Sequence, residues 1–233
     1  MKIGNVLLIL LLFVIAHGLR AQNIERILET HYAAHTQDFW DQVRTVTVEG
    51  AWFKGNERTT YTLHAKRPNK ILLKGMWQGE PYTEAFDGQV AWTVAPWTKV
   101  GKPQLMLTHE QEMITHLFDY GSAIPRDAVL EYKGKVKEEG IYMYWLTELR
   151  EEVQYDYFVD VEKHYLRKVN RRETLGDEIE LLTKTYDIFK QFGGVTFPTV
   201  IWIKTEEAER EFVFDDLVVG DGISNDIFKQ PTQ

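Results

Sequence analysis

Two histidines lie four residues apart in HYAAH and are the first residues whose spacing could support chemistry. On a helix, His31 and His35 would share one face and could bind a metal ion together. The segment lacks the glutamate of a zinc peptidase motif and no third ligand is evident, so ordinary helix-face histidines are favoured. Glu112 and His116 have the same spacing. We interpret this pair as a first-turn carboxylate and a partly buried side chain of a covering helix.

The other groups that could react are too few or too far apart. The chain has two serines, Ser122 and Ser224, and neither lies in the G-x-S-x-G turn of a serine hydrolase. Asp156 and Asp160 share one strand face about 13 Å apart, beyond the usual separation of paired glycosidase carboxylates, so we assign them to a solvated face. The stretch DDLVVGDG lacks the alternation of a calcium loop. We predict no catalytic residue, no metal site and no cofactor.

The N-terminal residues have the pattern of a secretory signal peptide. Lys2 precedes an unbroken apolar run over residues 6–15, and Ala21 is a small residue at the expected cleavage point. The run is too short to span a bilayer, which takes about 20 residues. We expect residues 1–21 to be removed and residues 22–233 to form one domain. An uncleaved membrane anchor stays open as the alternative.

Composition limits the partners of the mature chain. Without the signal peptide it carries 25 basic and 35 acidic residues, a net charge of −10. That charge repels phosphate backbones and no basic cluster is present, so we expect no nucleic-acid partner. The lack of cysteine excludes disulfides, thiolate metal sites and a lipidated cysteine after the signal. We expect a monomer that is free in an extracytoplasmic space.

The spacing of apolar residues predicts a mainly β protein with a few helices. The first helix has apolar residues on one face from Ile24 onwards and extends to about His35, followed by a short turn at residues 39–40. Beyond that turn, alternating apolar residues predict about eleven antiparallel strands, and Asp87-Gly88 is typical of a hairpin turn. A single sheet of this length must curl, and its concave apolar face must be covered by the helices.

A second helix interrupts the strands in THEQEMITHLFDYG and is predicted over residues 108–119. Thr108 and Gln111 form a capping-box pattern, and Gly121 ends the helix. We expect this helix to cover the concave face as a lid. Its apolar stripe consists of Met113, Ile114, Leu117 and Phe118.

The strands present more large apolar side chains than two short helices can cover, which favours a hydrophobic cavity. Gly50 and Gly75 fall on apolar strand faces, where the missing side chain leaves room. A plain packed core filled by the aromatic residues is the alternative. The residues expected to line the cavity are Val46, Val48, Trp52, Tyr61, Leu63, Ile71, Leu73, Trp77, Val90, Trp92, Val94, Tyr155 and Tyr157.

Five segments follow one another in a further pattern. A strand after a basic-Pro-Asn-Lys turn lies in KRPNKILLKG (66–75), and an Asp-Gly hairpin with a tryptophan strand lies in FDGQVAWTVAPW (86–97). An Asp-centred turn between two strands lies in YFVDVEKHYLRKV (157–169). The last two segments, a Gly-Val, Phe-Pro stretch and a closing strand with a Phe-x-x-Pro tail, are YDIFKQFGGVTFPTVI (186–201) and FVFDDLVVGDGISNDIFKQP (212–231). In this order they resemble the LolA-like periplasmic lipoprotein carriers, a family in one superfamily with LolB and LppX.

The resemblance spans roughly residues 24–231 and implies an open, incomplete antiparallel β-barrel whose interior holds acyl chains beneath helices. It implies a non-catalytic periplasmic carrier. Such a carrier takes lipoprotein or lipid acyl chains from an inner-membrane donor and delivers them to an outer-membrane acceptor. The alternative is an envelope-stress or regulatory module of the same fold that senses lipids and binds a membrane protein. Extra sequence around residues 120–150 and 170–180 leaves the cargo open.

Overall fold

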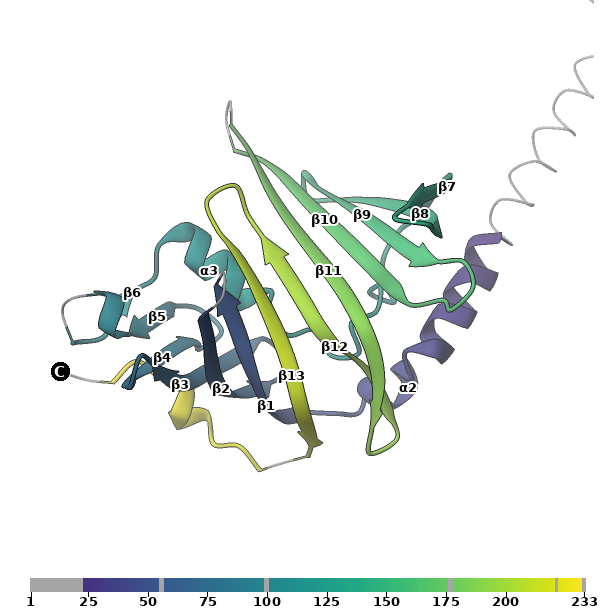
Figure 1. Cartoon of the computed structure of the whole chain (residues 1–233). Helices are drawn as coiled ribbons and strands as arrows, with labels where there is room; N and C mark the ends of the chain where they lie inside the picture. The colour runs from purple at the N-terminus through teal and green to yellow at the C-terminus, as the bar shows by residue number, and fades with distance from the viewer. Residues whose placement is uncertain (1–22, 55–56, 99–100, 176–177, 221, 232–233) are drawn as a thin grey trace, which may run out of the picture.

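The computed structural model describes residues 23–54, 57–98, 101–175, 178–220 and 222–231 (Figure 1). The predicted signal peptide lies outside these residues. Within them, thirteen antiparallel strands form one sheet. They are β1 (Thr45–Lys54), β2 (Glu57–Lys66), β3 (Lys70–Trp77), β4 (Glu80–Phe86), β5 (Ala91–Val94), β6 (Gln104–Leu105), β7 (Glu131–Glu138), β8 (Ile141–Arg150), β9 (Val153–Asp160), β10 (Leu166–Leu175), β11 (Glu178–Phe192), β12 (Val195–Lys204) and β13 (Glu209–Val219).

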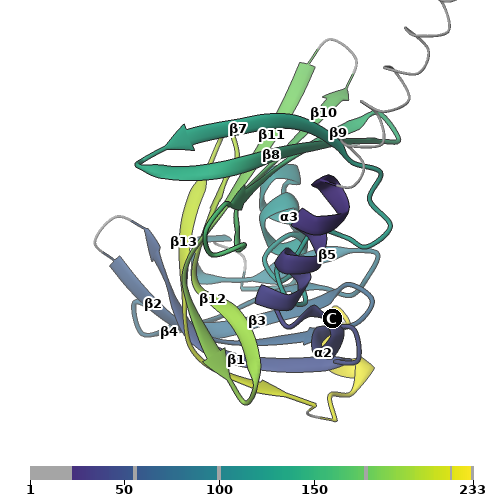
Figure 2. The same cartoon turned by 90° about the vertical axis from the view of Figure 1, so that its right-hand side faces the viewer.

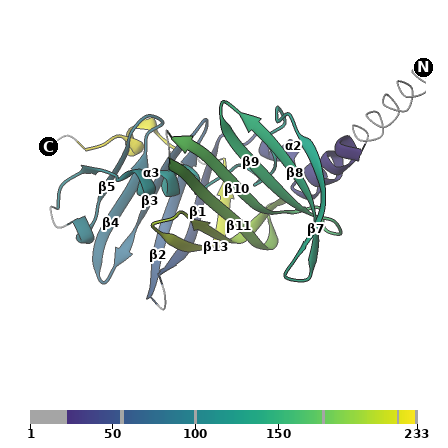
Figure 3. The same ribbon diagram turned by 90° about the horizontal axis from the view of Figure 1, so that it is seen from above.

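The order of strands explains why the sheet stays open. It runs β6-β5-β4-β3-β2-β1-β13-β12-β11-β10-β9-β8-β7, so that β1 pairs with β13 in the middle while β6 and β7 form the two edges. Seen from above, the sheet extends from β5 at one end to β7 at the other (Figure 3). The edge strands follow one another in the chain, and residues 106–130 connect them. The prediction of a mainly β, open antiparallel barrel is confirmed.

Five helical segments accompany the sheet in the described part of the chain. They are a helix over residues 23–34, α2 (Gln37–Trp40), α3 (Thr108–Thr115) and two short 3-10 turns, η1 (Pro96–Thr98) and η2 (Asn225–Phe228). The curled sheet encloses α3 and the helix over residues 23–34 on its concave side (Figure 2). Among these residues, no helix combines the length and the hydropathy that crossing a bilayer requires.

The count of eleven strands was too low because β6 and β7 were not predicted. β6 has two residues, too few for a pattern. β7 is EYKGKVKE, with charged or exposed side chains at most positions. Edge strands are protected from further pairing by such charges, especially lysine, so they lack the apolar alternation that identifies inner strands.

The covering helix is also shorter than predicted and is capped differently. α3 ends at Thr115 rather than at residue 119, and the residues after it continue as irregular chain. Its N-cap is Leu107, whose backbone N–H donates to a carboxylate oxygen of Glu110 at 3.0 Å. The predicted capping pair of Thr108 and Gln111 is therefore wrong by one residue. The residues at the N-cap and N3 positions are Leu107 and Glu110.

Gly50 and Gly75 do not leave open space, contrary to the prediction. A Cβ on Gly50 would lie 2.2 Å from the Val213 carbonyl oxygen and 2.8 Å from the Tyr61 hydroxyl. A Cβ on Gly75 would lie 2.6 Å from the Tyr82 ring. Tyr61 and Tyr82 are the cross-strand neighbours of these glycines, so each tyrosine lies across the backbone of a glycine. The glycines thus allow dense packing.

Substituting Gly75 with alanine tests this packing. We expect Gly75→Ala to lower the free energy of unfolding by about 1–3 kcal/mol, because the added methyl group overlaps its neighbours. One of these neighbours is the backbone oxygen of Thr60, 2.1 Å from the new Cβ, which cannot rotate away. Gly222→Ala is the control, because no atom lies within 4 Å of its Cβ. Urea denaturation of both variants provides the measurement, and equal midpoints for Gly75→Ala and wild type would contradict it.

Candidate functional site

The residues predicted to form the lid lie against the concave face of the sheet. We define the covering segment as residues 108–119, which comprises α3 and the irregular chain after it. Met113, Ile114, Leu117 and Phe118 are each at most 5 % exposed. Phe118 stacks on Phe197 of β12, with ring centroids 5.1 Å apart. The covering segment therefore contributes its apolar side chains to the main core.

Most residues expected to line a cavity share this core. Eight of them are buried in the same cluster as the covering segment: Val46, Val48, Trp52, Tyr61, Leu63, Ile71, Leu73 and Tyr157. Trp77 and Tyr155 are partly buried against it. The two-residue period thus identified one face of the sheet, as expected for strands. That these residues bind a ligand stays a prediction.

Three expected cavity residues do not lie on that face. Trp92 packs in a second cluster with Leu72, Ala85 and Phe228, and its indole N–H donates to the Phe228 carbonyl oxygen at 2.9 Å. Val94 is partly buried against this cluster, and Val90 is 39 % exposed and precedes β5. The assignment of Val90, Trp92 and Val94 to the cavity is therefore wrong. Ala91 and Thr93 on one face of β5 are buried, and the face with Trp92 and Val94 is covered by η2 at the C-terminal end.

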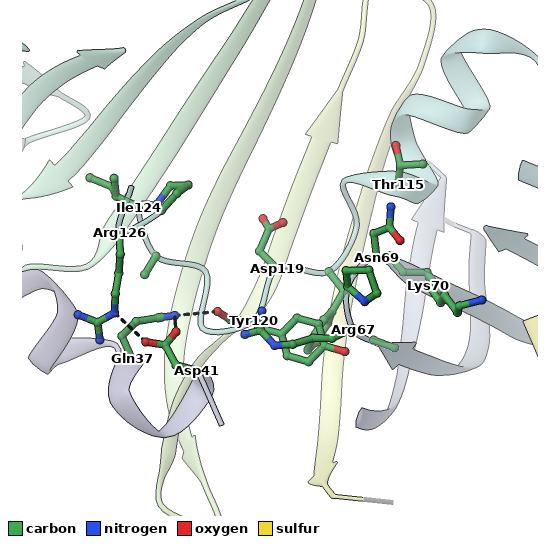
Figure 4. A pocket seen from close by; sticks show the side chains of 16 residues that line it. Gln37, Asp41, Arg67, Asn69, Lys70, Thr115, Asp119, Tyr120, Ile124 and Arg126 are labelled. Atoms are coloured by element: carbon green, nitrogen blue, oxygen red, sulfur yellow. Dashed lines mark hydrogen bonds and ion pairs between the residues drawn. The ribbon is translucent and has the colours of Figure 1, made fainter. Parts of the chain in front are cut away.

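Within the described residues, the apolar side chains of the covering segment occupy part of the concave face. A pocket of about 430 Å³ lies between α2, the start of β3 and the end of the covering segment (Figure 4). A groove of about 630 Å³ lies between α3, β11 and the turn after β12. Of the residues expected to form the cavity and lid, Ile71 and Phe118 line the first and none lines the second. The side chains of the covering segment fill the space in which the cavity was expected.

The wall of the pocket is polar and held in place by hydrogen bonds and ion pairs. Arg126 contacts the carboxylates of Asp38 and Asp41, and the Gln37 amide donates to Asp41 at 2.8 Å (Figure 4). Arg67 donates to backbone oxygens of α2 and the residues after it, and its guanidinium lies 4.2 Å from the centre of the Tyr120 ring. These contacts connect α2 to the chain that follows the covering segment.

A buried lysine of β11 attaches the C-terminal end of the covering segment to the sheet. Lys184 of β11 is 3 % exposed, and its ammonium donates to the Asp119 carboxylate at 2.5 Å and to the His116 carbonyl oxygen at 2.6 Å. The Tyr186 hydroxyl donates to the same carboxylate oxygen at 3.0 Å. Sequence reasoning missed this site. Its signal was the lysine between Leu182 and Tyr186, at a position whose neighbours two residues away are both buried.

Two further polar contacts hold α3 at the groove. Glu112 accepts from Arg171 of β10 at 3.3 Å, and His116 lies 3.5 Å from the same carboxylate oxygen. Hydrogen bonding to His116, opposed by burial, lowers the pKa of Glu112 below its usual value, with the charge of Arg171 assisting. His109 contacts Glu207 in the turn after β12 at 2.5 Å. The covering segment thus makes polar contacts with β10, β11 and the turn after β12, in addition to its apolar contacts with the core.

His31 and His35 are structural residues in a fully buried position. The His31 ring donates from Nδ1 to the His164 carbonyl oxygen at 2.9 Å and accepts the Ile124 N–H at Nε2 at 3.0 Å. The His35 ring does the same with the Gly121 carbonyl oxygen at 2.6 Å and the Leu166 N–H at 3.0 Å. Every ring nitrogen therefore has a backbone partner.

Metal binding is not available to these imidazoles, because their nitrogens are occupied. Among the described residues, no group of three or more His, Cys, Asp and Glu side chains could hold a metal ion. Both histidines instead join the helix over residues 23–34 to two loops that are distant in the chain. The interpretation as helix-face histidines understated their burial.

Asp156 and Asp160 are buried, so their assignment to a solvated face is wrong. Asp156 accepts the indole N–H of Trp145 at 2.9 Å. Asp160 accepts two backbone N–H groups of the following turn at 2.9 Å and an N–H of Arg167 at 3.3 Å. Long side chains from the neighbouring strands cover this face of β9, and alternation within one strand cannot reveal that cover.

The serines do not form a reactive site. Ser122 is fully buried in the loop after the covering segment, as predicted, with a positive φ of 47°. Its hydroxyl has no hydrogen-bond partner in the described structure. Ser224 caps η2, where its hydroxyl accepts the Asp226 N–H at 3.2 Å.

The fold is similar to that of solved structures whose sequences are only distantly similar to this chain. No protein-family model and no curated protein matches the chain. A putative outer membrane lipoprotein-sorting protein domain from Vibrio parahaemolyticus has a TM-score of 0.55 at 11 % identity, covering 88 % of this chain and 96 % of that one. A LolA superfamily protein from Nitrosomonas europaea has a TM-score of 0.54 at 15 % identity, covering 88 % and 96 %. A DUF1329 family protein from Desulfovibrio piger has a TM-score of 0.54 at 11 % identity, covering 87 % and 97 %. The chain therefore has a LolA-like fold, with an unclosed antiparallel sheet around its covering helices.

Proposed function

We propose that the chain is a periplasmic carrier that holds the acyl chains of a lipoprotein or lipid on the concave face of its sheet, without catalysis. The observation that supports this proposal most directly is that a short segment of the chain covers the concave face of the sheet. The inward side chains of the sheet are mainly apolar, and part of their cover is the short covering segment, which lies within the connection between the two edge strands. Moving this segment away would expose apolar surface without breaking a pair of strands.

The exchange of the covering segment for an acyl chain is energetically balanced. In the closed form, four apolar side chains of the segment occupy the concave face. In the loaded form, methylene groups of the ligand take their place, at about 0.8 kcal/mol for each one buried. The acyl chain and the covering segment bury the same apolar surface of the sheet in turn. Loading and release therefore need no nucleotide. An acceptor with a more favourable site is sufficient to receive the cargo.

Secretion and partners follow from the same proposal. The predicted signal peptide would deliver the mature chain to the periplasm, where an inner-membrane donor loads it and an outer-membrane acceptor unloads it. The fold resembles that of a protein described as a lipoprotein-sorting domain, which supports lipoprotein acyl chains as one class of cargo. A monomer is sufficient for this cycle, because the concave face lies within one chain.

Binding of an apolar dye tests the proposed function. We expect the mature protein, residues 22–233, to bind N-phenyl-1-naphthylamine saturably with increased fluorescence, and oleate to displace the dye. The reason is that the covering segment can yield the concave face to an apolar molecule. The control is Leu149→Asn, because Leu149 is a 74 % exposed side chain on β8 where dye could adsorb non-specifically. Wild-type binding by this variant supports an internal site, whereas a folded wild-type protein that binds no dye contradicts the proposal.

A further inference from the structure

Among the described residues, Lys184 is the most deeply buried of the lysines and arginines, and it lies on the concave face among buried apolar neighbours. Its side chain is 4 % exposed and lies in the same inward row as Leu182 and Tyr186, which belong to the main core. A charged ammonium is costly to bury unless it has an anionic partner and hydrogen bonds. A surface devoted only to acyl chains would gain from an apolar residue here.

The partner of this cation comes from the covering segment. The Asp119 carboxylate lies 2.5 Å from the ammonium, and the His116 carbonyl oxygen lies 2.6 Å from it. Both acceptors belong to the segment that must move when a ligand enters, whereas Lys184 and Tyr186 belong to β11. Opening therefore leaves a cation and a hydroxyl donor on the concave face without their acceptors.

The Asp119 carboxylate is accessible to an incoming group. Its side chain is 45 % exposed and lines the pocket of about 430 Å³, where it is drawn near the centre of Figure 4. Burial raises the pKa of Asp119, but the charge of Lys184 and the hydrogen bonds from Lys184 and Tyr186 lower it by more, below its usual value. Asp119 is thus a carboxylate at neutral pH, whereas burial lowers the pKa of Lys184. A second anion of similar geometry could replace this carboxylate.

We propose, building on the carrier function above, that Lys184 and Tyr186 bind the anionic oxygens of an amphiphilic ligand, as a carboxylate or a phosphate. Asp119 occupies this position in the ligand-free protein. The acyl chain of such a ligand replaces the apolar side chains of the covering segment, and its anionic group replaces the Asp119 carboxylate. The proposal selects anionic amphiphiles over neutral ones as cargo.

The groove beside α3 offers a way to this site. It is lined by Leu182, two residues before Lys184 on the same side of β11, and by Ile179 and Leu181, which are 54 % and 38 % exposed. At its edge, Arg171 pairs with Glu112 of the covering segment. A carboxylate of the covering segment thus faces a cation of the sheet at two positions, Glu112 and Asp119.

The test compares two probes with the same chain and different charge. Fluorescence titration measures the binding of cis-parinaric acid and of its methyl ester at pH 8, below their aggregation concentrations. We expect wild type to bind the acid at least about 10-fold more tightly than the ester, and Lys184→Met to bind the two equally. Asp119→Asn should raise the affinity for the acid several-fold more than the affinity for the ester, because the competing carboxylate is removed. Lys204→Met, at a 63 % exposed lysine of β12, should behave as wild type.

Each outcome bears on one proposal. Equal wild-type affinities for acid and ester, or an acid preference that survives in Lys184→Met, overturn the anionic site and leave the carrier function standing. Failure of both probes to bind contradicts the carrier function itself. If Lys184→Met does not fold, Asp119→Asn decides, because a larger preference for the acid over the ester cannot result from lost structure. An unchanged preference overturns the proposal. Displacement of the bound acid by oleate or by oleoyl lysophosphatidic acid then distinguishes a carboxylate from a phosphate ligand.

Discussion

Replacing Phe118 by alanine should lower the free energy of unfolding of the ligand-free protein by about 3–5 kcal/mol while leaving its affinity for an apolar probe equal or higher. The Phe118 ring is 5 % exposed, stacks on Phe197, and has edge contacts with Trp40 and Tyr120 at centroid distances of 6.3 and 5.2 Å. Its removal leaves a cavity at the end of the covering segment. Because the segment competes with ligand for the concave face, weakening it does not weaken the loaded form.

Urea denaturation with and without N-phenyl-1-naphthylamine, together with dye titration, measures both parts of this prediction. Phe39→Ala is the matched control, since that ring is 43 % exposed on α2 and should cost little. A loss of affinity in Phe118→Ala that matches its loss of stability would show that the ring is ordinary core in both states. The covering segment would then not be a lid.

Acidification should destabilise the protein through its two buried histidines. Burial lowers the pKa of His31 from 6.5 to about 4, and burial followed by the charge of His31 keeps the pKa of His35 well below its usual value. The unfolded chain therefore takes up these protons at higher pH than the folded chain does. At about 1.4 kcal/mol per pKa unit, His31 alone contributes about 3 kcal/mol above pH 6.5, which is lost as the pH falls from 6.5 to 4.

The measurement is the free energy of unfolding in urea between pH 7.5 and pH 4. We expect the combined variant His31→Gln and His35→Gln to be less stable than wild type at pH 7.5 and to depend less on pH, because glutamine can donate and accept without titrating. Parallel curves for wild type and the combined variant would assign the acid sensitivity to other groups.

The local pattern of the sequence was sufficient for the elements and for much of the covered face. Apolar alternation identified eleven of the strands, because a strand with one covered face repeats every two residues. Asp87 accepts the backbone N–H groups of Gln89 and Val90 through its carboxylate, and Gly88 has a φ of 102°, so the predicted hairpin turn is present. The helical spacing of four apolar residues predicted that residues 108–119 cover the sheet. All four side chains are buried in the core.

Contacts between distant parts of the chain decided the rest. Periodicity places Trp92 and Thr93 on opposite faces of β5, but only the arrival of η2 assigns Trp92 to the outer one. The space beside Gly75 is filled by Tyr82 of the next strand, and the Asp156 carboxylate is covered by Trp145. No window of sequence contains these partners.

The polar site beneath the covering segment shows the same limit most clearly. By itself, the sequence determined that one face of a long sheet is apolar and that residues 108–119 can cover it, because each property follows from the period of a single element. The tertiary structure alone decided that Asp119 meets Lys184, 65 residues further along the chain. A lysine in a strand is usually solvated, and only its burial among residues from other strands and from the covering segment makes the ion pair necessary.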